Sequence, residues 1–337
     1  MIRNYLSKEI LISLSVIGGC ALIVSIIRPK RRLRVTEKNC VFITGCDSGL
    51  GLTLAIKCHE LGLFVIAGCL NVESDGAKKL TSYANNRMIV AEVDIRNNGS
   101  IKAAGDKVSD LLIRNGLNFT ALINNAGIMV LGEFEWQTMA MIESQIEVNL
   151  IGTMKLTKQF LPMCRQYNAR IIVVTSHCSL QALPSISPYG ASKGGLGFFV
   201  DALRVEMKKY QVDVVNFIPG SFIMQSNIFA RQQEYSQEMR KQMTDEQLQF
   251  YGDYFNEFNN YLLQLDQYRK PGLIGDVALL NLFERALLEV NPRSIYINQN
   301  WRYAAYHFLC GISPVCIRDW LIVRFMTMPT YKPTAKK

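Results

Sequence analysis

The sequence predicts a doubly wound α/β fold, in which helices cover both faces of a seven-stranded parallel sheet, with a transmembrane helix in front of it. From residue 40 onward, short apolar runs alternate with longer segments of helical periodicity, a pattern typical of βαβ units. Ahead of them, residues 10–27 carry no charge. No Pro/Gly/Ser-rich linker divides the 337 residues, so one large domain with appendages is expected.

The apolar run, ILISLSVIGGCALIVSII, is long enough to cross a membrane. Its 18 residues rise about 27 Å as a helix, close to the roughly 30 Å of a hydrocarbon core. Five basic residues follow within 28–34, whereas Arg3 and Lys8 precede the run, and this asymmetry marks the cytosolic end. A cleaved signal peptide is the alternative, but arginines stand where small residues would flank a cleavage site. Residues 1–34 are therefore predicted to form a membrane anchor with a basic flank.

The alternation after the anchor defines the elements of the sheet. The predicted strands are Cys40 to Thr44, Phe64 to Ala67, Met88 to Val93, Ala121 to Ile123, Ile171 to Thr175, Val212 to Ile218 and Ile295 to Ile297. The predicted helices lie near 50–61, 100–115, 137–166, 188–210 and 275–290. This order predicts a Rossmann-type catalytic domain over residues 38–300.

Two segments do not belong to that alternation. An insertion over 228–270 carries an aromatic and apolar stripe at helical spacing, formed by Tyr251, Tyr254, Phe255, Phe258, Tyr261, Leu262 and Leu265. Core packing and a lid over an apolar substrate are both open for this stripe. The tail, 301–337, is apolar but interrupted by charges and a proline, which argues against a second span. A membrane-surface contact, a dimer contact and packing on the main domain remain open for it.

Charge and composition exclude several classes of function. The net charge of +9 is concentrated in the basic flank of the anchor, so a nucleic-acid partner is not expected. Nine cysteines without a CxxC pair predict reduced, buried thiols. Three histidines far apart in the chain, His59, His177 and His307, supply no metal-ligand pattern, so no metal site is expected.

A glycine-rich turn follows the first strand and opens a helix, where free backbone N–H groups and the helix dipole favour a pyrophosphate. The residues expected to contact a nucleotide there are Gly45, Asp47, Ser48, Gly49, Leu50 and Gly51. Such a turn alone is weak evidence, because many strand–helix junctions need glycine only for their backbone geometry. The downstream motifs INNAG, VNLIGT, TSHCS, YGASK and PG make the assignment specific.

Tyr189 and Lys193 stand four residues apart on a predicted helix and therefore on one face. A neighbouring ammonium favours phenolate, so we expect it to lower the pKa of Tyr189 and make the phenol a usable acid/base. Ser176 ends a predicted strand and is placed to bind the substrate oxygen. Asn149 lies within a predicted helix, where its side chain could hold a water that links Lys193 to solvent.

The spaced set TGxxxGxG, NNAG, Asn, Ser, YxxxK and PG resembles the short-chain dehydrogenase/reductase family over residues 38 to about 300. The turn TGCDSGLG, the anchor and the ending MPTYKP are similar to the branch that holds 17β-hydroxysteroid dehydrogenase type 2, retinol dehydrogenases and hydroxybutyrate dehydrogenase. Within that branch the chain is similar to a dehydrogenase implicated in making the steroid ecdysone.

The resemblance implies a role for each matching residue. Tyr189 is the proton donor or acceptor, Lys193 binds the ribose, Ser176 orients the substrate and Asn149 belongs to a proton relay. The implied cofactor contacts outside the glycine turn are Asp94, Asn125, Ala126, Gly127, Tyr189, Lys193, Pro219 and Gly220. Two plain structural alternatives stay open, in which Asn125 only ties strands together and Asp94 is an ordinary strand-end cap.

The cofactor is expected to be NAD, with NADP the less favoured alternative. The turn holds Asp47, and no cation follows the second strand to bind a 2′-phosphate. The usual acidic ribose ligand at the end of that strand is missing. The family's threonine after PG is also missing, with Met224 near its place between Ser221 and Ser226, which puts the nicotinamide contact in doubt.

The resulting hypothesis is a membrane-anchored oxidoreductase that transfers hydride between NAD(P) and a secondary alcohol or ketone of a small lipophilic substrate. A sterol or steroid is expected, with ecdysteroid synthesis as the pathway, and retinol is the alternative. The endoplasmic reticulum membrane is the expected location, with the mitochondrial membrane less favoured. A homodimer through 137–166 and 188–210 remains open, as does a non-catalytic nucleotide-binding adaptor.

Overall fold

The structure, a computed structural model, describes residues 31–83, 87–223, 225–268, 270, 272–326 and 328–332. The predicted anchor over 10–27 and Met224, which stands near the place of the family's missing threonine, lie outside the described residues. Within the described part of the chain, no helix has both the length and the apolar content needed to cross a bilayer.

One seven-stranded parallel sheet forms the centre of the fold, in the order β3-β2-β1-β4-β5-β6-β7. Its strands are β1 (Asn39–Thr44), β2 (Phe64–Cys69), β3 (Met88–Glu92), β4 (Asn118–Asn124), β5 (Arg170–Val174), β6 (Val214–Ile218) and β7 (Ile295–Ile297). All seven predicted strands are confirmed, with bounds that shift by at most three residues. The order reverses between β1 and β4, which opens a crevice at the carboxyl ends of these strands, where sheets of this type bind ligands.

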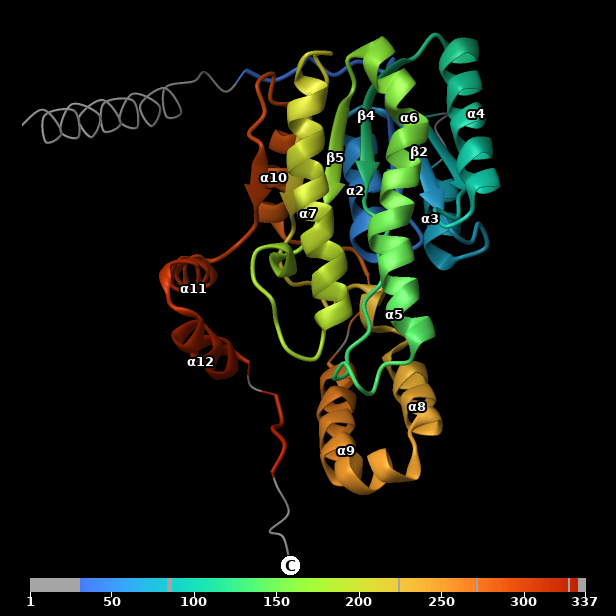
Figure 1. Ribbon diagram of the computed structural model, residues 1–337. Coiled ribbons are helices and arrows are strands. Elements are labelled where there is room, and N and C mark those ends of the chain that lie inside the picture. Colours follow the sequence, from blue (N-terminus) through green and yellow to red (C-terminus); the bar gives the residue numbers. More distant parts are fainter. Residues whose placement is uncertain are drawn as a thin grey trace, which may run out of the picture.

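Helices cover both faces of the sheet, and each face has its own apolar cluster (Figure 1). On one face lie α2 (Gly49–Glu60), α3 (Asp75–Ser82) and α10 (Val277–Leu288). On the other lie α4 (Asn98–Asn115), α6 (Thr153–Tyr167) and α7 (Ser187–Lys208). The near-continuous burial of β1, β2 and β5 follows from this double cover.

Two helical segments differ from the sequence prediction. Helix α3 was not predicted because its eight residues, DGAKKLTS, are mostly polar and bury only Gly76, Ala77 and Leu80. The single helix expected over 137–166 is instead α5 (Met139–Ile146), a π-helical turn (Glu147–Gly152) and α6. Gly152 explains the irregularity in part, because a Cβ there would lie 2.9 Å from the Ile95 carbonyl oxygen, so the backbones are in close contact.

The predicted insertion forms the helical pair α8 (Gln232–Gln242) and α9 (Asp245–Gln267). In Figure 1 the pair lies beyond the arrowheads of β4 and β5, at the carboxyl end of the sheet. The aromatic stripe of α9 packs around Trp136, whose ring lies 5.1–5.9 Å from the rings of Tyr251, Tyr254, Phe255 and Phe258. In this structure the stripe therefore serves packing, and a lid function stays a prediction.

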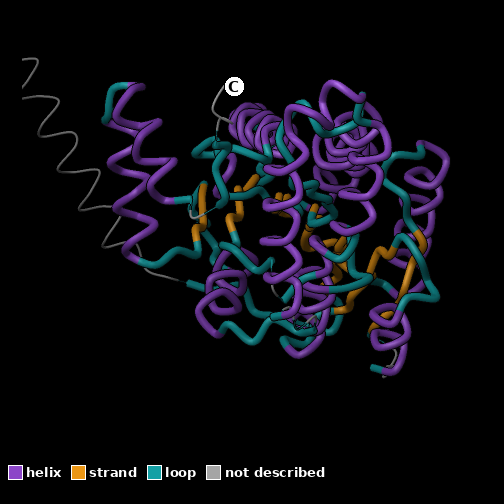
Figure 2. Tube along the Cα trace, turned by 90° about the horizontal axis from the view of Figure 1, so that it is seen from below, coloured by secondary structure: helices purple, strands orange, loops and turns teal. Residues whose placement is uncertain are grey.

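The tail forms a helical hairpin, α11 (Trp301–Ile312) and α12 (Val315–Phe325), which stands apart from the sheet and its helices in both views (Figures 1 and 2). It contacts the segment after β5 through stacked imidazoles, with His177 Nδ1 and His307 Nε2 2.8 Å apart. The last described residues then reach α9, where Tyr331 stacks on Phe250. The hairpin is therefore held at two points and not along a broad interface.

The imidazole pair predicts a pH-dependent attachment of the hairpin. Burial lowers the pKa of both His177 and His307 below the usual 6.5, so the folded state favours their neutral forms. The stabilisation they give is complete above pH 6.5 and is lost as the pH falls through the lowered values. Hydrogen exchange over residues 301–310 should accelerate between pH 7.5 and 5.5, after correction for intrinsic rates. The variant H307A should exchange fast at both pH values, and a wild-type rate unaffected by pH would contradict the assignment.

Candidate active site

The glycine turn between β1 and α2 leaves its backbone accessible. Gly45 and Gly49 adopt φ angles of +71° and +54°, in the left-handed region that disfavours side chains. A Cβ on Gly51 would lie 2.1 Å from the Gly45 carbonyl oxygen, so only glycine fits. The Ser48 side chain makes no capping hydrogen bond to α2. The turn thus fits the pyrophosphate of a dinucleotide, which would lie against the N–H groups that begin α2.

Asp47 places a carboxylate at the end of β2, where the acidic ribose ligand of the family is missing from the sequence. Its two carboxylate oxygens accept hydrogen bonds of 2.9 Å from the backbone N–H groups of Leu70 and Asn71. Gly76 of α3 packs on the same turn, since a Cβ there would lie 2.0 Å from the Asp47 carbonyl oxygen. A negative charge therefore stands at the strand end where an adenosine ribose binds in folds of this kind.

Asn125 and Asp94, both predicted to contact the cofactor, make hydrogen bonds within the protein that hold the local structure together. Asn125 Nδ2 donates to the carbonyl oxygens of Thr44 (2.9 Å) and Gly45 (3.3 Å), which ties β4 to the glycine turn. Ala126 lies against Gly45, 2.9 Å from the position of a Cβ. Asp94 accepts three hydrogen bonds from the Arg96 guanidinium and one from the Arg96 backbone N–H. Contacts of these residues with the cofactor stay predictions.

Tyr189 and Ser176 come together at the carboxyl end of β5. Tyr189 lies in the first turn of α7, where Pro188 helps to start the helix, and it is 6% exposed. Its phenol lies close enough to Ser176 for the serine side chain to lower the pKa of the phenol. The serine hydroxyl also accepts the backbone N–H of Cys178 at 3.2 Å, which fixes its direction. A substrate oxygen that contacts both hydroxyls would lie within reach of a proton donor.

Lys193 lies one helical turn beyond Tyr189 and is 4% exposed. Its Nζ donates to the Val174 carbonyl oxygen at the end of β5 (3.1 Å). A Cβ on Gly127 would lie 3.4 Å from this Nζ, so the glycine leaves room for the ammonium beside the loop after β4. Burial lowers the pKa of Lys193 to about 8. The ammonium is thus held at the site despite an unfavourable environment.

The expected lowering of the Tyr189 pKa is wrong for this structure. Burial raises the pKa of the phenol above its usual range, and the influence of the nearby Ser176 side chain opposes the rise only partly. Loss of hydration outweighs any attraction from Lys193, whose Nζ is engaged by the Val174 carbonyl. The phenol is therefore protonated at neutral pH here, and it begins as a proton donor to a carbonyl oxygen or a hydrogen-bond donor to an alcohol.

Asn149 lies within the π-helical turn and is fully buried. Its Nδ2 donates to the Ile128 carbonyl oxygen and to Ser192 Oγ, both at 2.9 Å, and its Oδ1 accepts the Ile128 N–H at 2.8 Å. Both amide hydrogens are thus used to bind the loop after β4 to α7. π-Helical turns are frequent at functional sites. Any water that Asn149 holds for a relay would have to donate to Oδ1 or to the main chain, so the relay role stays a prediction.

Several residues at the site were missed by sequence reasoning. Cys178 hydrogen-bonds Ser176, and its charge state affects the pKa of both Tyr189 and Lys193, so the thiol lies among the catalytic groups. The buried Gln145 and Gln232 bind the backbone N–H groups of the loop after β4, at Val130 and Leu131. These residues belong to no catalytic motif, and their roles depend on contacts with residues far away in the sequence, so the sequence alone does not indicate them.

The PG pair ends β6 beside the same crevice. Gly220 has a φ of +100°, and Asn298 Nδ2 donates to the Pro219 carbonyl oxygen at 3.0 Å. Asn298, another residue missed from the sequence, also presents its carbonyl oxygen to His177 Nε2 at 3.3 Å. His177 thus contacts β7 and the tail and does not pair with Ser176. Ser226 lies against the glycine turn, 3.0 Å from the position of a Cβ on Gly49.

The chain belongs to the short chain dehydrogenase family, whose profile matches residues 39–235. It is 30% identical to mitochondrial D-beta-hydroxybutyrate dehydrogenase of Mus musculus, over 85% of this chain and 80% of that protein. It is 29% identical to estradiol 17-beta-dehydrogenase 2 of Mus musculus, over 96% and 85% of the two chains. A short chain dehydrogenase/reductase from Burkholderia phymatum, solved with NAD, shares the fold with a TM-score of 0.65 at 20% identity, over 89% and 99% of the chains. The predicted family and branch are confirmed, and the protein is an oxidoreductase that acts on alcohol groups.

Replacing Lys193 by methionine should stabilise the fold while it abolishes activity. A lysine whose pKa is lowered by folding destabilises the protein below that pKa, and the penalty vanishes above the 10.5 of an exposed lysine. K193M should therefore raise the free energy of unfolding at pH 7 by up to about 3 kcal/mol. Urea unfolding at pH 7 and pH 10.5 measures this gain, which should disappear at the higher pH. The exposed Lys208 on the same helix provides the control variant K208M, and a K193M protein less stable than wild type at pH 7 would refute the prediction.

Proposed function

We propose that the protein is a membrane-anchored, NAD-dependent dehydrogenase that oxidises a secondary alcohol of a lipophilic molecule, with a sterol or steroid as substrate and ecdysteroid synthesis as its pathway. The observation that carries the proposal is the convergence of Ser176, Tyr189 and Lys193 at the carboxyl end of β5. Retinol remains the alternative substrate, on the resemblance of the glycine turn and C-terminal motif to retinol dehydrogenases.

Ser176, Tyr189 and Lys193 have separate roles in the proposed oxidation. A bound nicotinamide ring supplies a hydride acceptor. Ser176 donates a hydrogen bond to the substrate oxygen, and Tyr189 exchanges a proton with it. For alcohol oxidation Tyr189 must act as phenolate and accept the hydroxyl proton of the substrate, and the positive charge of Lys193, one helical turn away, favours that phenolate form. Its ammonium also has the position, beside Gly127, from which it would bind a ribose hydroxyl.

The surroundings of Tyr189 support an apolar substrate. Its side chain belongs to the cluster that also holds Ile186 and Phe229, and the partly buried Leu183, Ile223 and Ile228 pack on the same cluster. A carbinol carbon beside the phenol would therefore be embedded in hydrocarbon on several sides. A cavity of about 290 Å³ lies between α8 and α9, but it is lined by none of the catalytic residues, so the reacting carbon does not lie there.

The position of Asp47 supports NAD over NADP. Its carboxylate accepts hydrogen bonds from the backbone N–H groups at the end of β2, so these donors are not available to a 2′-phosphate, and the negative charge would repel it. D47S removes the negative charge and frees both donors, so the ratio of kcat/KM for NADP to that for NAD should rise at least tenfold, about 1.4 kcal/mol. Initial rates with each cofactor measure the ratio. D75N removes a nearby charge from the first turn of α3 and should leave the ratio unchanged. An unchanged ratio in D47S would contradict the assignment.

The anchor and the quaternary structure are parts of the same proposal. The apolar run over 10–27 with its basic flank supports insertion in the endoplasmic reticulum membrane, with the catalytic domain on the cytosolic side. Lipophilic substrates partition into the bilayer, so an anchor keeps the active site beside them. Two exposed apolar residues on α7, Phe198 and Val205, support a homodimer through this helix.

The variant Y189F separates the dehydrogenase from a non-catalytic nucleotide-binding adaptor. Loss of the phenolic proton should lower turnover about 10²–10⁴-fold and leave cofactor binding intact. The assay follows reduced cofactor by absorbance with NAD or NADP and a panel of sterols, steroids and retinols. Y210F changes an exposed tyrosine just beyond α7 and serves as the control. Cofactor binding without turnover on any substrate, together with full biological effect of Y189F, would favour the adaptor.

A further inference from the structure

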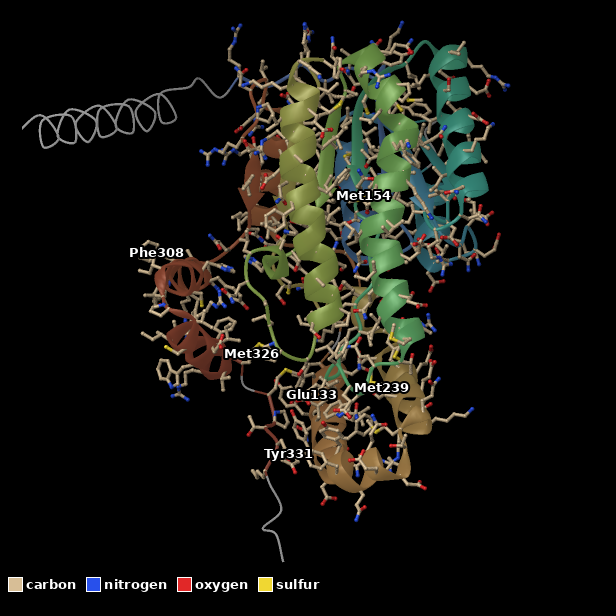
Figure 3. The ribbon with its side chains drawn as sticks, viewed as in Figure 1. Glu133, Met154, Met239, Phe308, Met326 and Tyr331 are labelled. Atoms are coloured by element: carbon tan, nitrogen blue, oxygen red, sulfur yellow. The ribbon has the colours of Figure 1, made fainter. Side chains whose placement is uncertain are left out.

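The outer face of the α11–α12 hairpin is apolar and exposed to solvent. The large apolar side chains exposed on the hairpin are Trp301, Phe308, Leu309, Ile312, Val315, Ile317, Trp320 and Val323. Trp301 and Trp320 are 79% and 64% exposed, in contrast to 2% for Trp136 in the core. Figure 3 shows Phe308 on the side of α11 that points away from the sheet. Such a concentration of exposed apolar side chains on two short helices marks an interaction site.

The inner face of the hairpin already accounts for its contact with the domain. Tyr303, Tyr306 and His307 lie on one side of α11, at helical spacing, and line a small cavity with Phe325 of α12 and with His177. Trp301, Phe308 and Ile312 lie on the opposite side. The inner face thus contacts the domain, whereas the outer face has no partner within the described residues.

The partner is suggested by what lies next to the hairpin in the fold. Arg31 and Leu33 form backbone hydrogen bonds with Val290 and Leu288, so the chain from the apolar run enters the domain just before β7. Helix α11 begins directly after β7, the edge strand, which has only three residues. The basic flank and the exposed hairpin therefore lie at the two ends of the same edge strand, the flank near its amino end and the hairpin after its carboxyl end.

The charges of the hairpin match a membrane surface. Its cationic residues are Arg302, Arg318 and Arg324, against the single acidic Asp319. Tryptophans among apolar residues with arginines nearby are typical of helices that lie in the interface of a bilayer. Pro314 separates the two helices, so neither is long enough to span.

We infer that the outer face of α11–α12 lies in the interfacial layer of the membrane that holds the proposed N-terminal anchor. The inference rests on the proposed function for that anchor, and it adds a second, independent contact. It also gives the active site an orientation. The inner face of the hairpin binds His177, the residue after Ser176, so the membrane contact holds the loop of the catalytic serine close to the lipid surface.

The three tryptophans of the chain make a direct test possible. The full-length protein is reconstituted in phosphatidylcholine/phosphatidylserine vesicles, with or without bromine on the acyl chains. Bromine quenches tryptophans that reach the hydrocarbon boundary. We expect a loss of emission in brominated vesicles, which disappears in W301F/W320F because the remaining Trp136 is buried. Flotation of the vesicles reports the anchor separately, and the experiment needs no turnover.

A matched probe excludes a general effect of reconstitution. Ile113 on α4 is 75% exposed, so I113W in the W301F/W320F background places a tryptophan of similar exposure on another face, and its emission should not be quenched. Vesicle-bound protein without quenching of Trp301 and Trp320 would overturn the inference but leave the anchor intact. A shift of emission that depends on protein concentration and not on bromine would overturn it in favour of a second copy of the chain. Failure to float would overturn both.

Discussion

The buried ammonium of Lys193 is the constraint around which the active site is organised. The charge lies in an environment that disfavours it, and the Val174 carbonyl oxygen at the end of β5 gives it a direct partner. Gly127 must stay without a side chain to leave room beside it. The position of this glycine is in turn fixed by Asn149, which binds the next residue, Ile128, through both its donor and its acceptor. The parallel sheet, the π-helical turn and α7 are all needed to hold the Lys193 ammonium at the site of the Tyr189 phenol.

The sheet could be predicted from the sequence because β1, β2, β5 and β6 are buried on both faces and therefore form apolar runs in the sequence. The same reasoning missed α3, whose polar sequence forms a helix through the Ser74 cap and the burial of Ala77 and Leu80. It also missed the break in the helix over 137–166, because a π-helical turn leaves no signal in apolar periodicity. Contacts between residues far apart in the chain determine both the formation of α3 and the break between α5 and α6.

The catalytic residues could be named from the sequence, but their energetics could not. Spacing placed Tyr189 and Lys193 on one face of a helix, and this is correct. It could not show that burial raises the pKa of the phenol, because burial depends on the packing of residues such as Ile186 and Phe229 around it. In the same way, the sequence showed Asp47 as a charge in the turn, whereas its hydrogen bonds to Leu70 and Asn71 place that charge at the end of β2.

The last described residues of the chain connect the two appendages of the domain. Tyr254 of α9 donates to the Pro329 carbonyl oxygen, and Tyr331 stacks on Phe250. The insertion and the hairpin are thus joined by a few residues of extended chain, so a displacement of one pulls on the other. A bulky label attached within residues 328–332 would therefore disturb both appendages at once.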